Sequence, residues 1–83
     1  MNRTQIIETI NNFLIEDIEV APEALKENAF LKEDLGIDSL DFVDIVVVVE
    51  QNFGFKIKPE EMAKVKTLLQ FYDYIEGKLK ANN

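Results

Sequence analysis

The residue whose type and position most clearly suggest chemistry is Ser39, which directly follows Asp38 and stands two residues before Asp41. Gly36 breaks the chain ahead of it, and Asp38 or Ser39 can cap a helix while Asp41 completes a capping-box-like start. A helix N-terminus has unpaired N–H groups and a partial positive charge. The sequence therefore predicts a serine hydroxyl displayed where a phosphodiester would meet neither strain nor unfavourable charge.

Catalysis by the chain itself is disfavoured by the residue types present. A serine nucleophile needs a general base, and the chain contains no histidine. Asp38 and Asp41 could do acid–base chemistry only in a cleft, which a domain this small does not imply. With no cysteine and no calcium-loop spacing, no metal site is predicted either. We therefore expect a protein that is not an enzyme.

Length and composition predict one small soluble domain. We expect residues 1–83 to form it as a monomer, with residues 81–83 frayed. Apolar residues make up 47% of the chain, yet no apolar run approaches the ~20 residues of a membrane span. The first residues contain no secretory hydrophobic segment, so a cytoplasmic location is expected.

The net charge of −7 is concentrated around Ser39. Residues 33–55 contain six acidic residues and no basic one, whereas residues 56–83 contain six basic and four acidic residues. Nucleic acid is an improbable partner, because phosphate binding needs clustered lysine and arginine. The carboxylates either steer basic partners toward the serine or only solvate a helix end, where acids are favourable in any case.

The elements that must position Ser39 are predicted to be helices. Apolar residues recur at helical spacing over residues 4–16, with Thr4 as the N-cap, and Pro22 ends this segment. A long connection then runs to Asp38. Apolar residues are expected to anchor it on the core: Leu25, Phe30, Leu31, Leu35 and Ile37.

The segment after Ser39, residues 39–53, presents a conflict between propensity and pattern. Five consecutive β-branched residues, 45–49, favour a strand, but the cap residues, the long apolar pattern and the lack of a partner strand favour a helix. At about 100° per residue, one face is predicted to meet the core: Phe42, Ile45, Val46, Val49 and Phe53. Leu40, Val43 and Val47 lie opposite, and we expect them to dock a partner rather than to be buried.

The remainder of the chain predicts two further helices. Gly54 ends the second helix, an extended link follows, and Pro59 opens a short third helix. Residues 67–70 form a capping box for the last helix, whose core stripe is Leu68, Tyr72, Ile75 and Leu79. The fold class is therefore all-α, a small four-helix bundle of three longer helices and one short one, with a long loop between helices 1 and 2.

Taken in order, these motifs resemble the acyl carrier protein family. The similarity begins with Glu-Asp-Leu-Gly-Ile-Asp-Ser-Leu at residues 33–40 and continues through Asp41, Val43, Asp44, Glu50, Phe53, Ile57, residues 60–61 and residues 73–75. The resemblance implies that a phosphopantetheinyl transferase attaches 4′-phosphopantetheine from coenzyme A to Ser39, between Asp38 and Leu40. The thiol of that arm would carry acyl groups as thioesters between enzymes of fatty-acid or related lipid biosynthesis.

The resemblance also implies two surfaces. Enzymes with basic patches would dock on the second helix, on Asp38, Leu40, Asp41, Val43, Asp44, Val47 and Glu50. An acyl chain could fold back toward Val46, Ile57, Met62 and Val65, although each of these residues could equally be ordinary core packing.

The chain departs from the family pattern in several places, which keeps alternatives open. Gln51 and Asn52 stand where many relatives have glutamates, and Lys56 and Lys58 where acids are more usual. A specialised carrier of the secondary-metabolite, peptidyl or D-alanyl type is one alternative. An unmodified helical adaptor that docks through residues 40–50 is another, with Ser39 as a simple N-cap.

Overall fold

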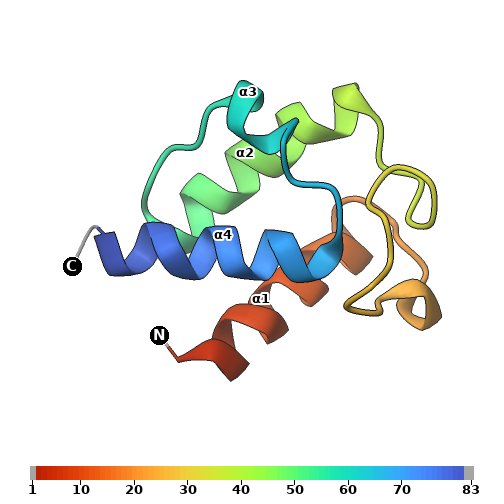
Figure 1. Ribbon diagram of the computed structural model, residues 1–83, viewed down its shortest axis with the longest axis horizontal. Helices are drawn as coiled ribbons and strands as arrows, with labels where there is room; N and C mark the ends of the chain where they lie inside the picture. The colour runs from red at the N-terminus through yellow and green to blue at the C-terminus, as the bar shows by residue number, and fades with distance from the viewer. Residues whose placement is uncertain (1, 82–83) are drawn as a thin grey trace.

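The computed structural model describes residues 2–81, and the chain folds as a small bundle of helices (Figure 1). The helices are α1 (Arg3–Glu16), α2 (Ser39–Phe53), α3 (Pro59–Met62) and α4 (Leu68–Ala81). A short 3-10 helix, η1 (Pro22–Ala24), lies in the long connection between α1 and α2. The expected all-α bundle of three longer helices and one short one is confirmed. Of the predicted frayed tail, Ala81 ends α4, and Asn82 and Asn83 lie outside the described residues.

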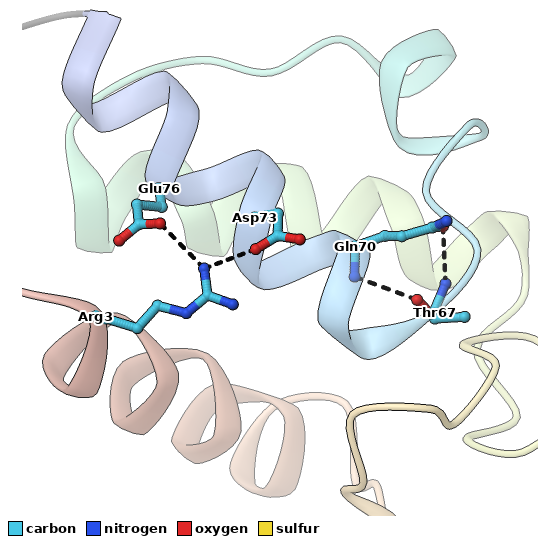
Figure 2. Close-up of polar contacts among 5 residues, drawn as sticks. All are labelled: Arg3, Thr67, Gln70, Asp73 and Glu76. Carbon is cyan, nitrogen blue, oxygen red and sulfur yellow. Dashed lines mark hydrogen bonds and ion pairs between the residues drawn. The ribbon is translucent and has the colours of Figure 1, made fainter.

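Reciprocal capping boxes begin α1 and α4. Thr67 and Gln70 form the predicted box of α4: the Gln70 N–H donates to Thr67 Oγ1 at 3.2 Å, and Gln70 Oε1 accepts the Thr67 N–H at 3.2 Å (Figure 2). The predicted Thr4 cap of α1 is wrong. Asn2 caps this helix instead, because its side chain accepts the Gln5 N–H at 2.9 Å while Gln5 Oε1 accepts the Asn2 N–H at 3.1 Å.

The β-branched run of residues 45–49 is helical, as the pattern predicted. Ile45 and Val49 are fully buried, so burial of one face outweighs the β propensity of the individual residues. Phe42, Val46 and Phe53 complete this face and are partly buried at its edges. Gly54 ends α2 in the left-handed conformation with φ of 80°, where a residue with a Cβ atom would be strained.

One cluster of apolar side chains fills the space between the helices. α1 lies beside α4, and α3 lies beside α2 (Figure 1). The rings of Phe13 and Phe71 meet edge to face, with centroids 6.3 Å apart. In the predicted stripe of α4, Leu68, Tyr72 and Ile75 are buried and Leu79 is partly buried.

The connection between α1 and α2 is anchored on the core, with one exception. Leu31 and Ile37 are buried, and Leu25 and Leu35 are partly buried. The predicted anchoring of Phe30 is wrong, because its side chain is 48% exposed. Phe30 forms an isolated antiparallel bridge with Thr67, and alternation along this extended pair directs the neighbouring Ala29 and Leu31 inward and Phe30 outward.

Arg3 connects the start of α1 to the middle of α4 (Figure 2). Its Nη1 lies 2.8 Å from Asp73 Oδ1 and 3.1 Å from Glu76 Oε1, and its guanidinium lies 5.9 Å from the centroid of the Tyr72 ring. The hydrogen bond with Asp73 is the largest cause that raises the pKa of Arg3. One cation thus holds two carboxylates and covers one aromatic ring of α4.

We expect Arg3→Gln to lower the free energy of unfolding by roughly 1 kcal/mol, because it removes two ion pairs, one with the exposed Asp73 and one with the half-buried Glu76. Urea denaturation at low and high salt measures the effect, which should shrink as salt rises. Lys26→Gln is the matched control, because this substitution removes the same charge from an exposed position. An equal loss of unfolding free energy in both variants would contradict a specific stabilising role for the Arg3 ion pairs.

Candidate functional site

Ser39 is the first residue of α2, and its side chain is exposed. The chain just before it is fixed by Ile37, which is buried and donates its N–H to the Leu31 carbonyl oxygen at 2.9 Å. Gly36 makes the turn with φ of 71°, and no atom lies within 4 Å of where its Cβ would be. The need for glycine there is therefore conformational rather than steric. Together these residues fix the place of Ser39 and leave its hydroxyl outside.

The predicted capping box at the start of α2 is confirmed. Asp38 Oδ1 accepts the N–H groups of Leu40 at 2.9 Å and of Asp41 at 3.1 Å, while Asp41 Oδ2 accepts the Asp38 N–H at 3.1 Å. Asp38 thus accepts two of the N–H groups at this helix end, those of Leu40 and Asp41, whereas the Ser39 N–H donates to no residue between 2 and 81. The unpaired N–H groups expected at this end are therefore reduced to that of Ser39. A phosphodiester on Ser39 would find most of the N–H groups at this helix end already paired.

The Ser39 hydroxyl makes no hydrogen bond with any residue from 2 to 81. The two nearest carboxylates are committed to backbone N–H groups, so neither is placed as a general base for the serine. The hydroxyl is accessible to a modifying enzyme that brings its own base. The arrangement is suited to covalent attachment and not to catalysis by the chain.

The exposed face of α2 has the predicted apolar stripe. Leu40, Val43 and Val47 are 77%, 55% and 48% exposed, and their spacing of three and four residues aligns them along the helix. Asp44 and Glu50 are also exposed, while Asp41 is half-buried. Lys56 Nζ lies 4.0 Å from Glu50 Oε1, so positive charge offsets the rim at the far end of α2. The negative charge is therefore greatest at the end that carries Ser39.

The four residues suggested for an acyl chain meet in the core beside α2 and α3. Ile57, Met62 and Val65 are buried, and Val46 is partly buried against the same cluster. In this structure they pack as ordinary core residues do.

A surface cleft of about 230 Å³ opens beside the first turn of α2. Its apolar walls include Leu31, Phe42 and Val65, and Lys32 and Lys66 line its rim. Phe42 stands three residues after Ser39, so the cleft begins one helical turn from the hydroxyl. Sequence analysis missed this cleft because its walls come from three separate segments, two of which are joined by backbone hydrogen bonds between residues 29–31 and residues 66–68.

Two other kinds of site are absent from the part of the chain that the structure describes. No group of three or more aspartate, glutamate, histidine or cysteine residues there could hold a metal ion. None of the helices between residues 2 and 81 is long and apolar enough to cross a membrane.

Comparison with known proteins gives a consistent result along the whole chain. The family model for the phosphopantetheine attachment site matches residues 4–75. An acyl carrier protein of Thermosynechococcus vestitus is 36% identical over 81 residues, covering 98% of this chain and 100% of that protein. An acyl carrier protein of Coprothermobacter proteolyticus is 37% identical over 79 residues, covering 95% of this chain and 96% of that protein.

Replacing the cap at α2 should destabilise the fold measurably. We expect Asp38→Ala to lower the free energy of unfolding by about 0.5–2 kcal/mol, because Leu40 and Asp41 lose their N–H acceptor. Asp38→Asn retains an acceptor oxygen and should cost much less. Asp44→Ala controls for loss of an exposed carboxylate on the same helix. If urea denaturation gave equal losses for the two alanine variants, the cap would not have its assigned role.

Proposed function

This chain belongs to the acyl carrier protein family, whose cofactor is a covalent 4′-phosphopantetheine, and we propose that Ser39 is the residue that carries it. Members of this family carry acyl groups and do not catalyse their conversion. The observation that supports Ser39 most strongly is its exposed hydroxyl, which has no hydrogen-bond partner among the described residues and lies at a fixed helix start.

The residues around Ser39 fit such a group. Leu40 and Asp38 flank the attachment point, and both are exposed, as Ser39 is. When bound, the group supplies the thiol that forms thioesters, which this cysteine-free chain lacks. Because Asp38 and Asp41 accept backbone N–H groups, removal of the Ser39 proton falls to the transferase that attaches the arm.

We propose that partner enzymes dock on the exposed face of α2. Its apolar contacts would be Leu40, Val43 and Val47, with Asp38, Asp41, Asp44 and Glu50 as the carboxylates. Such a surface complements a basic patch with an apolar centre. The partners in this proposal are a phosphopantetheinyl transferase and the acyl-transfer and synthesis enzymes that share the carrier.

We further propose the setting in which the carrier works. Residues 1–83 would act as one monomeric domain in the cytoplasm and serve fatty-acid or related lipid biosynthesis. An apolar acyl chain would lie against Val46, Ile57, Met62 and Val65 when it enters the bundle. A specialised pathway is the alternative, favoured by Lys56 and Lys58, which put positive charge beside the C-terminal end of α2.

Loading of the purified chain tests the assignment of Ser39. Incubation with coenzyme A and a broad-specificity phosphopantetheinyl transferase should add the mass of one phosphopantetheine, as measured on the intact protein. Ser39→Ala should fold and gain nothing. A folded wild-type chain that stays unmodified with several transferases would contradict the carrier function and favour an unmodified adaptor.

Charge reversal tests the docking face. We expect Asp44→Lys to slow loading at low salt by roughly ten-fold, because like charges would meet across the interface, and the difference should fall as salt rises. Glu8→Lys makes the same change of charge on an exposed position of α1. Equal slowing of both variants would indicate an effect of net charge and would contradict docking through α2.

A further inference from the structure

The short helix α3 is attached to the rest of the fold through few interactions. Within the described residues, the backbone N–H groups of residues 61–65 donate only to carbonyl oxygens between residues 58 and 62. The segment is therefore closed on itself and forms no backbone hydrogen bond with α2 or α4 in that part of the chain. Its position depends on side chains.

Met62 and Glu61 connect α3 to the rest of the fold through their side chains. Met62 is fully buried in the core cluster. Glu61 lies on the same helix, and its Oε1 is 3.1 Å from Lys78 Nζ on α4. The other oxygen of Glu61 accepts the Lys58 N–H at 3.4 Å, so this carboxylate both caps α3 and connects it to α4. The hydrogen bond from Lys78 is the largest cause that lowers the pKa of Glu61.

Tyr74 lies under the same contact. Lys78 Nζ is 5.7 Å from the centroid of the Tyr74 ring, and the Tyr74 hydroxyl is buried without a well-formed hydrogen bond. Burial first, and the nearby charge of Glu61 second, raise the pKa of Tyr74 to about 12. Glu61, Lys78 and Tyr74 thus form one cluster that joins α3 to α4.

We propose that the Glu61–Lys78 ion pair is a latch on α3, and that it determines how readily an acyl group enters the core beneath this helix. Met62 is fully buried, and Ile57 and Val65 are 4% and 8% exposed, so a chain that passes beyond the surface cleft to lie beneath Met62 must displace α3. Displacement breaks the ion pair, because Glu61 moves with α3 while Lys78 stays on α4. The role in acyl entry rests on the proposed carrier function, whereas the latch itself is a property of the unmodified chain.

Hydrogen exchange on the unmodified protein tests the latch without any arm. Lys78→Met removes the charge and retains an unbranched apolar side chain over the Tyr74 ring, and Glu61→Gln removes the charge but keeps a cap acceptor. Each variant should speed exchange of the amides of residues 62–65 by roughly two- to five-fold, as expected for loss of a partly exposed pair. Amides of Val48 and Val49 in α2 serve as the internal reference.

The matched control is Lys80→Met, which removes one exposed lysine from α4. It should leave exchange in residues 62–65 unchanged, and the Glu61→Gln/Lys78→Met double variant should open no more than the single variants. Equal acceleration by the control, additive effects in the double variant, or no acceleration at all would overturn the latch.

Thioester reactivity tests the role in acyl entry. Hydroxylamine cleaves an octanoyl thioester only while it is outside the core, so its rate relative to an acetyl thioester reports the fraction outside. In Lys78→Met and Glu61→Gln there is no ion pair to break, so displacement of α3 costs less and a larger fraction of the octanoyl chain should lie inside the core. The ratio of the two cleavage rates should therefore fall roughly two- to five-fold in these variants. An unchanged or higher ratio would overturn the role in acyl entry. Failure to load the arm would instead contradict the proposed function and leave the exchange result standing.

Discussion

The site depends on the reciprocal hydrogen bonds between the Asp38 and Asp41 side chains and the backbone at the start of α2. They set where the helix begins and so help to place Ser39. Buried Ile37 fixes the preceding chain to the core. The Asp38 carboxylate also accepts the N–H groups of Leu40 and Asp41, which leaves few donors at this helix end for an anion on Ser39.

The other helices support α2 through one small apolar core. A chain of 83 residues buries a limited area, and it does so here by sharing one apolar cluster among all the long helices. Only one face of α2 is needed for that core, which leaves Leu40, Val43 and Val47 exposed beside Ser39. The apolar stripe and the acidic surroundings therefore follow from the same amphipathic helix that positions the serine.

Local signals in the sequence predicted most of the helix boundaries. The capping boxes at residues 38–41 and 67–70, Gly54 and Pro59 act over a few residues, so their effect could be inferred without the fold. The Asn2–Gln5 box was equally local and was overlooked. Phe30, the cleft beside Phe42 and the Glu61–Lys78 pair could not be predicted, because each depends on how distant segments pair in space.

The central claim is that Ser39 carries the phosphopantetheine arm in the living cell. The most direct measurement is tandem mass spectrometry of the protein isolated from the cells that make it, with fragmentation that locates the modified residue. The account predicts a phosphopantetheine, free or acylated, on the peptide that contains Ser39. A protein that is recovered unmodified throughout growth, or that carries the group on another residue, would contradict it.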